Sequence, residues 1–389
     1  MISNKLFFDK SKYVKMIPCQ TNRYFSRIVI SCLLLWATML CADPWPVVEP
    51  ESAGFQKDKL EKVAEYAKEK TGTTGLVVVV NGKIIYTYGD IKQVSYTASC
   101  RKSVLSMLYG KYVADGTIKL DETIGQLGID DLQGLLPQEK EATVYDLITA
   151  RSGVYHPASN PGGIPEGKNY ERGVTPHGTR FVYNNWDFNV AGTVFTLKTG
   201  LDIYDALERN LAIPLGMEDF DRAKHKLSGN AEKSKHLAYY MHFSTRDMAR
   251  IGQLMLQKGR WNDKQLVPEE WVARSTSVVT PLNRELHCGY GILWWLLRDK
   301  QYPEQFKGAY SAEGMYGQFI TVFPAMNMVV AHKSAGNAKK RTTGSQYRHI
   351  LRLIVEASLP KEEPTVPKVE DVVPKAKDVA PKTEEKNAK

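Results

Sequence analysis

Apolar residues recur every three to four positions in several stretches of the chain, the spacing that predicts amphipathic helices. These stretches are Lys57–Lys70, Val144–Ala150, Trp186–Lys198, Ser244–Gln257 and Gln346–Ala357. A further helix is indicated by the same spacing at Val104, Leu105, Leu108, Tyr109 and Tyr112. Gly116 is expected to terminate it, because glycine readily adopts the left-handed conformation that ends a helix.

Short runs rich in β-branched and aromatic residues predict strands near both ends of the chain. Leu76–Val80 and Lys83–Tyr88 are separated only by Asn81-Gly82, a strong signal for a two-residue β-hairpin. Later runs predict further strands at Gly289–Leu297, Phe319–Phe323 and Met328–His332. The strands therefore lie early and late in the chain, with helices between them.

This order predicts a mixed α/β (α+β) fold, in which an antiparallel sheet is flanked by helices and carries an inserted helical subdomain. We expect a single domain over residues 43–360. Its sheet part is expected at about 50–115 and 284–358, and its helical part at about 116–283. Residues 361–389 contain seven lysines and seven acidic residues without an apolar period, which predicts a disordered tail rich in Lys, Glu and Pro.

The N-terminal segment has the pattern of a signal peptide. Arg23 and Arg27 precede an apolar run, Ile28–Leu40, and Cys41 and Ala42 follow it. The run is shorter than the roughly 18 to 20 residues that cross a bilayer, which favours a signal peptide over residues 1–42, cleaved near Ala42, over an uncleaved anchor. We therefore expect an exported protein, periplasmic or secreted. The long charged stretch before the run leaves Met16 as an alternative start.

Composition narrows the class of protein. With 43% hydrophobic residues the chain can bury a core, and no other apolar run resembles a membrane span. The net charge is +9, but residues 1–42 hold six Lys and Arg residues against one acidic residue, so the remainder carries only +4. Without a basic stripe we expect no nucleic-acid partner and only transient membrane contact through the leader.

A serine stands three residues before a lysine at the start of the helix that ends near Gly116. Positions i and i+3 share a helix face, so the Lys102 amine can lie beside the Ser99 hydroxyl. A serine needs a neighbouring base to act as a nucleophile, and a lysine serves as that base when burial or nearby cations lower its pKa. The spacing alone is weak, since Ser358 and Lys361 repeat it by chance. The alternative is a helix-capping region with a solvated lysine.

A second element, Tyr183-Asn184-Asn185, follows about 80 positions later. With Ser99 and Lys102 it resembles the penicillin-recognising serine hydrolase superfamily, and most closely the class C β-lactamase-like hydrolases. That branch includes esterases and 6-aminohexanoate-dimer hydrolase-like enzymes. The resemblance implies that Tyr183 is a general base or proton relay and that Asn185 orients Lys102 and the substrate. The alternative is a loop tyrosine, with Asn185 as the N-cap of the next helix.

Further segments carry the same resemblance over nearly all of residues 50–358, and together they imply a β-lactamase-like fold. They are Asp146–Gly153, Pro214–Met217, Ser244–Gly259 with Trp261, Pro268–Trp271, and Gly289–Gly291 with Trp294 and Trp295. Because one fold is shared by enzymes with different reactions, this resemblance implies the architecture more firmly than the reaction.

The third motif of the family is expected on a strand near the chain end, where Ala312-Glu313-Gly314 is the best candidate. The resemblance implies that Gly314 approaches the substrate and that the N–H groups of Met315 and Ser99 form an oxyanion hole. No lysine or histidine stands where relatives that process β-lactams hold the substrate carboxylate, which argues against efficient β-lactam hydrolysis. Glu313 would oppose negative substrates. The alternative is an ordinary glycine-containing turn.

We therefore expect an exported serine hydrolase that cleaves an ester or amide of a small molecule or short peptide through a Ser99 acyl-enzyme. The alternatives are a non-catalytic peptidoglycan- or penicillin-binding module, and a true β-lactamase or D-amino-acid peptidase. The scattered histidines predict no metal site, and no cofactor is expected. Cys100 is expected to be a buried structural thiol, and a bridge to Cys288 stays open.

Overall fold

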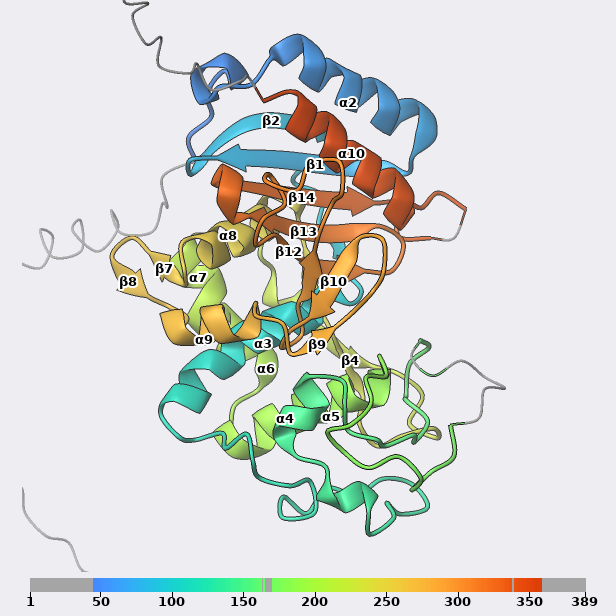
Figure 1. Cartoon of the computed structure of the whole chain (residues 1–389). Coiled ribbons are helices and arrows are strands. Elements are labelled where there is room, and N and C mark those ends of the chain that lie inside the picture. Colours follow the sequence, from blue (N-terminus) through green and yellow to red (C-terminus); the bar gives the residue numbers. More distant parts are fainter. Residues whose placement is uncertain (1–44, 163, 165–169, 338, 359–389) are drawn as a thin grey trace, which may run out of the picture.

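The computed structural model describes residues 45–162, 164, 170–337 and 339–358. An eight-stranded sheet occupies one half of the molecule, with the strand order β2-β1-β14-β13-β12-β11-β10-β9 (Figure 1). Its strands are β1 (Thr73–Val80), β2 (Lys83–Gly89), β9 (Thr280–Pro281), β10 (His287–Tyr290), β11 (Trp295–Leu297), β12 (Tyr310–Gly314), β13 (Gln318–Phe323) and β14 (Met328–Ser334). All neighbouring strands are antiparallel, as expected.

The sheet joins the two ends of the described chain. Asn81 and Gly82 both have positive φ, 51° and 74°, and form the predicted tight hairpin between β1 and β2. On its other edge β1 pairs with β14, so the first and the last strands along the described chain lie side by side in the sheet. Strands from the beginning and from the end of the described chain therefore form one sheet.

Helices cover both faces of the sheet and explain why β1 is apolar from Leu76 to Val80. Leu76 and Val78 pack with α2 (Lys57–Lys70) and α10 (Gly344–Glu356) in one hydrophobic cluster. Val77 and Val79 point the other way and pack with α8 (Thr245–Leu256) in a second cluster. A strand buried on both faces loses the polar alternation of a half-exposed strand. Although α8 lies in the stretch predicted to be helical, it packs directly against the sheet.

The other half of the molecule is mainly helical (Figure 1). Its helices are α3 (Cys100–Ala114), α4 (Val144–Ile148), α5 (Asn185–Thr199), α6 (Ile203–Leu207), α7 (Ile213–Leu215) and α9 (Glu269–Ser275), with a π-helical turn η3 (Glu208–Ala212). Short strand pairs are β3 (Ser95–Tyr96) with β6 (His242–Phe243), β4 (Lys226–Ser228) with β5 (Ala238–Tyr240), and β7 (Arg260–Trp261) with β8 (Lys264–Gln265). Short 3₁₀ turns are η1 (Pro50–Ala53), η2 (Glu139–Glu141), η4 (Arg222–Lys224) and η5 (Pro324–Met326).

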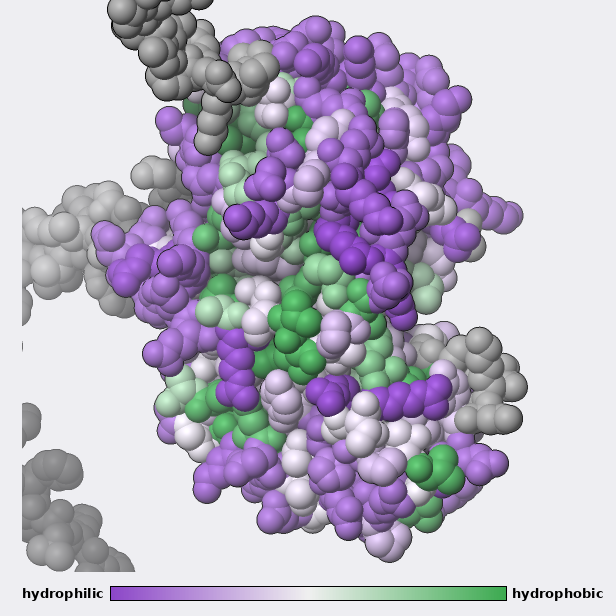
Figure 2. All heavy atoms as spheres, viewed as in Figure 1, coloured by the Kyte–Doolittle hydropathy of each residue, from purple (hydrophilic) through white to green (hydrophobic). Residues whose placement is uncertain are grey.

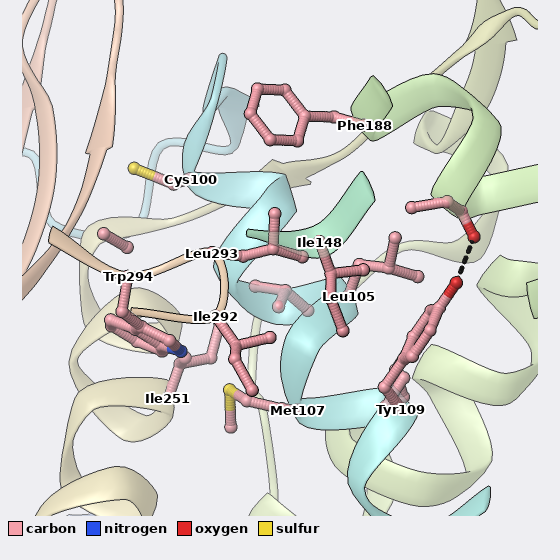
Figure 3. Close-up of a cluster of buried hydrophobic side chains, with 14 of the residues drawn as sticks. Cys100, Leu105, Met107, Tyr109, Ile148, Phe188, Ile251, Ile292, Leu293 and Trp294 are labelled. Carbon is pink, nitrogen blue, oxygen red and sulfur yellow. Dashed lines mark hydrogen bonds between the residues drawn. The ribbon is translucent and has the colours of Figure 1, made fainter. Parts of the chain in front are cut away.

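Helix α3 runs through the middle of the molecule and is buried along its first three turns. Every residue from Cys100 to Gly110 is buried, polar ones included. Figure 3 shows its apolar side chains packed against neighbouring elements, with the Tyr109 hydroxyl donating to the Ala191 carbonyl of α5 at 2.6 Å. The Ser103 and Ser106 hydroxyls donate to carbonyls in the turn between β10 and β11. These bonds connect the helical half to the sheet.

One sequence prediction, a single strand over Gly289–Leu297, and one alternative, Asn185 as a helix cap, are wrong. Gly289–Leu297 is not one strand, because the chain reverses between β10 and β11 at 291–294, where Leu293 adopts a φ of 63°. Asn185 is not a helix cap: it is the first residue of α5, and the Asn184 side chain caps the helix by accepting from the Trp186 N–H at 3.1 Å.

Among the described residues, no helix is long and apolar enough to cross a bilayer. The predicted signal peptide and the predicted tail lie outside the described residues.

Candidate active site

Ser99 stands at the N-terminus of α3 on a constrained backbone. The preceding Ala98 has a positive φ of 48°, an uncommon conformation for a residue with a side chain, found most often at turns and functional sites. Ser99 is half-buried, and its side chain makes no capping hydrogen bond to the helix. Its hydroxyl is therefore not engaged by the helix N–H groups. The N-terminal end of the helix dipole also favours negative charge developing at this point.

Lys102 brings the predicted residues together. Its Nζ lies 3.0 Å from Ser99 Oγ, 2.8 Å from Tyr183 Oη and 2.6 Å from Asn185 Oδ1. The side chain is 1% exposed, so the alternative of a solvated lysine is wrong. No ion pair joins Lys102 to an acidic residue in the described part of the chain. A buried amine surrounded by hydroxyl, phenol and amide oxygens has no compensating negative charge.

These surroundings favour the neutral amine. Burial lowers the pKa of Lys102 well below its usual range, and the neighbouring Arg101 guanidinium lowers it further. The Lys102 Nζ also lies 4.2 Å from the ring centroids of Tyr183 and Phe188. Burial raises the pKa of Tyr183 above its usual range, so its phenol is protonated. The lowered pKa of Lys102 thus favours an amine that can accept a proton, next to a phenol that can donate one.

Asn185 is fixed by a second hydrogen bond as well as by its place at the start of α5. Its Nδ2 donates to the Pro161 carbonyl at 2.7 Å, which leaves Oδ1 facing Lys102. A Cβ added to Gly162 would lie 3.0 Å from Asn185 Nδ2 and 4.0 Å from Met315 Cε. The backbone at Gly162 therefore lies close to both the Asn185 amide and the side chain of Met315.

Gly314, at the end of β12, packs against the segment that leads into Ser99. A Cβ at this position would lie 2.5 Å from the Thr97 carbonyl oxygen, so only glycine allows this approach. The next residue, Met315, is half-exposed. Neither the Ser99 nor the Met315 N–H donates a backbone hydrogen bond to a described residue. Gly314 ends β12, and the turn at 315–317 leads into the buried strand β13, so the alternative of a glycine-containing turn into a core strand stays open.

Aromatic rings line the site on the side of the sheet, and sequence reasoning did not assign this role to them. Tyr183 and Trp295 stack at a centroid distance of 5.4 Å, and Phe181 packs edge-on to Trp295 at 6.3 Å. Tyr290 packs against both Trp295 and Phe181. On the face of the molecule that Figure 2 shows, hydrophobic residues gather across the middle, at the level where Figure 1 places α3, β9 and β10. Contacts between distant segments carry no local sequence signal.

Known proteins resemble this chain in sequence and in fold. The model of the Beta-lactamase family matches residues 60–352, which is more than half of the chain. The chain belongs to the Beta-lactamase family. It is accordingly a serine hydrolase of the β-lactamase type. This places it in the penicillin-recognising serine hydrolase superfamily, which the motif of Ser99, Lys102, Tyr183 and Asn185 resembles.

Individual relatives are distant. The D-alanyl-D-alanine-carboxypeptidase/endopeptidase AmpH of Escherichia coli K12 is 22% identical over 220 residues, which cover 48% of this chain and 56% of the relative. The chain thus spans about half the length of the curated relatives it matches. A Bacillus anthracis protein classed as a 6-aminohexanoate-dimer hydrolase has a TM-score of 0.60 and 20% identity, over 82% of this chain and 90% of that chain. A class C β-lactamase has a TM-score of 0.58 and 16% identity, over 79% and 97%. At sequence identities of 16% to 20%, the likeness to these two structures shows a shared fold alone.

The remaining candidates have structural roles. Cys100 is buried and donates to the Gln318 carbonyl at 3.3 Å, and burial raises the pKa of its thiol, which confirms a structural thiol. Both Cys100 and Cys288 are free, so the bridge left open by the sequence is not formed. Within the described residues, no three His, Cys, Asp or Glu side chains converge as metal ligands would.

Proposed function

We propose that this chain cleaves an ester or amide bond through an acyl-enzyme on Ser99. The observation that carries the proposal is the buried Lys102 amine, which contacts the Ser99 hydroxyl, the Tyr183 phenol and the Asn185 amide at once. A lysine held in this way has no partner that would keep it charged. It can therefore serve as the base that a serine nucleophile requires.

In the proposed reaction a proton moves from Ser99 to Lys102 and on to the leaving group, and water later restores it to Ser99. The neutral Lys102 amine takes the proton of Ser99 Oγ as that oxygen forms a bond to the substrate carbonyl carbon. The N–H groups of Ser99 and Met315 donate to the resulting oxyanion. When the carbon–heteroatom bond breaks, the proton passes from Lys102 through the Tyr183 hydroxyl to the leaving alcohol or amine. Water then attacks the acyl ester by the reverse route and regenerates Ser99.

The residues around the oxyanion donors favour esters or amides over β-lactams. β12 places Ala312 and Glu313 directly before Gly314, so this strand offers a carboxylate and no cation to a substrate carboxylate. We also propose export, supported by the signal-peptide pattern of residues 1–42, and the N-terminal residue of the mature protein would test it. A start near Asp43 is expected, whereas a retained leader would contradict the proposal.

Labelling with a fluorophosphonate tests the nucleophile independently of the natural substrate. Intact mass should show one adduct on the wild type and none on Ser99→Ala. The matched control is Ser277→Ala, an exposed serine outside the site, which should react at the wild-type rate. Labelling of Ser99→Ala at an undiminished rate would contradict the proposal. An unreactive wild type that still binds a penicillin would instead favour a non-catalytic module.

A further inference from the structure

A cavity of about 380 Å³ lies where α7, α8 and β7 meet the turn of the β1–β2 hairpin (Figure 1). This turn, with Gly82 in the cavity wall, is at the end of the sheet where β14 begins. Gly314 is at the opposite end, where β14 finishes. Neither Ser99 nor Lys102 lines the cavity. It is therefore separate from the proposed active site.

Two buried polar side chains of α8 line this cavity and leave hydrogen-bonding atoms unused. Gln253 is 2% exposed and Arg250 is 3% exposed. Within the described residues, Gln253 Oε1 and Arg250 Nε have no hydrogen-bond partner. Buried polar atoms in native proteins nearly always have one, because an unpaired buried donor or acceptor is costly. A ligand in the cavity would supply a donor for Gln253 and an acceptor for Arg250.

The cavity offers no unpaired charge to a ligand. Arg250 is the one charged side chain among its described lining residues. The Arg250 guanidinium already donates to Glu218 Oε1 at 2.9 Å and to the Leu215 carbonyl at 2.8 Å. The other polar side chains of the lining are the uncharged amides of Gln253, Gln257 and Asn262. These surroundings favour an uncharged ligand that both donates and accepts hydrogen bonds.

Indole rings provide the apolar part of the lining. Trp45 and Trp261 are half-buried and pack edge to face at a centroid distance of 6.2 Å. Aromatic rings present a broad apolar surface to the C–H groups of a ligand, while amide and hydroxyl groups both donate and accept. The volume is near the lower end of the roughly 300–1,000 Å³ of small-molecule sites, which suits a ligand of one ring.

We propose that this cavity binds one pyranose ring of a glycan. The C–H groups of the sugar pack against Trp45 and Trp261, one sugar hydroxyl donates to Gln253 Oε1, and another accepts from Arg250 Nε. A proline-rich peptide also has apolar rings, but proline lacks an N–H group and leaves Gln253 Oε1 without a donor. The site takes no part in hydrolysis, so it holds the enzyme on a carbohydrate without reacting with it.

Ligand-observed NMR titrations test this binding in the full chain. The probes are methyl β-D-glucopyranoside and methyl N-acetyl-β-D-glucosaminide. Cyclohexanol is the control for apolar contact alone, and acetyl-tetraproline amide is the control for a proline-rich peptide. Gln253→Leu removes the amide but keeps a side chain of similar size, and Trp261→Leu removes one indole ring. The control variant is Gln93→Leu, which changes an exposed glutamine outside the cavity.

At least one of the two glycosides should bind to the wild type with a Kd on the order of 1 mM, as expected for so small a ligand. Gln253→Leu should weaken this binding about tenfold through the lost hydrogen bond. Its melting temperature should stay equal or rise, because an unpaired buried amide is replaced by an apolar group. Trp261→Leu should also weaken binding, and Gln93→Leu should bind as the wild type does.

Four results would overturn the inference. They are no binding of either glycoside to the wild type, unchanged affinity in Gln253→Leu, cyclohexanol binding as tightly as the glycosides, and binding of the proline peptide in their place. The inference does not depend on the proposed function. Fluorophosphonate labelling of Ser99 should be the same in the wild type, Gln253→Leu and Gln93→Leu. Sugar binding by a protein with an unreactive Ser99 would overturn the proposed function alone.

Discussion

Arg101 is a buried cation without an acidic partner next to the proposed catalytic lysine. It is 1% exposed, its Nε and Nη1 have no hydrogen-bond partner among the described residues, and its guanidinium lies 4.5 Å from the Tyr239 ring centroid. Its one hydrogen bond is to Asn189 Oδ1 at 3.3 Å. Burying an uncompensated charge is costly, and this charge lies next to Lys102 and lowers its pKa, so we infer an electrostatic role for Arg101.

Removing this charge should change the pH profile. Only the neutral Lys102 amine can accept the serine proton, so kcat/KM should rise with pH through the lowered pKa of Lys102. Because Arg101 helps to lower that pKa, Arg101→Met should raise it and move the acid limb of the profile to higher pH by about one unit. The measurement is kcat/KM against pH for a p-nitrophenyl ester.

The exposed Arg209→Met is the control and should leave the limb in place. An Arg101→Met protein with the wild-type melting temperature and an unmoved acid limb would show that the guanidinium does not act through Lys102.

Individual residues differ in how far the sequence predicts them. The spacing of Ser99 and Lys102 predicts their contact, because residues three positions apart lie on the same face of a helix, whatever packs around that helix. The contact between His287 and Glu313 joins β10 to β12 across the intervening strand β11, and no spacing in the chain indicates it. The same holds for the buried environment of Arg101, which depends on which distant segments pack around α3.

At the scale of elements, Lys333 ties β14 to the strand pair that leads into the site. Its Nζ donates to the carbonyls of Ser95 on β3, at 3.0 Å, and of Phe243 on β6. Burial lowers the pKa of Lys333 from 10.5 to about 7. Between these values the unfolded chain binds a proton that the folded chain does not, so stability rises with pH across this window.

Lys333→Met should remove that part of the rise. The difference in unfolding free energy between wild type and variant should therefore grow from pH 7 to 10, by about 1.4 kcal/mol per pH unit at most. Urea unfolding at several pH values measures it. The exposed Lys307→Met should show a constant difference. A constant difference for Lys333→Met as well would mean that the lysine keeps its proton when buried.

Elements with a strong local pattern are predicted well from the sequence. The structure gives α2 the predicted bounds, and the β1–β2 hairpin follows from Asn81-Gly82. The break between β10 and β11 is different, because a run of buried aliphatic and aromatic residues has the same pattern in a strand and in a buried turn. There the turn is held by tertiary bonds, among them the Ser103 hydroxyl donating to the Leu293 carbonyl.

At the scale of the whole molecule, the site lies where the two halves meet. Ser99 directly precedes α3 and Lys102 lies in its first turn. Tyr183 precedes α5, Asn185 is the first residue of α5, and Gly314 is the last residue of β12. The alternation of strands and helices predicts the layers but not which loop faces which strand. Only the family resemblance pointed to Gly314 as part of the site, because the residues around it carry no other distinguishing signal.

The contact between β12 and the start of α3 should therefore be necessary for activity. In Gly314→Ala the new Cβ would lie 2.5 Å from the Thr97 carbonyl oxygen and 3.2 Å from Ala98 Cβ, so β12 must move away from Ser99. Such overpacking costs about 1–3 kcal/mol of stability, which a folded variant can sustain. Displacing the Met315 N–H should lower kcat by about 10²-fold to 10³-fold, as loss of an oxyanion donor does. Gly344→Ala is the control, because its Cβ would meet nothing within 4 Å. Full activity in Gly314→Ala would place the oxyanion donor elsewhere than on Met315.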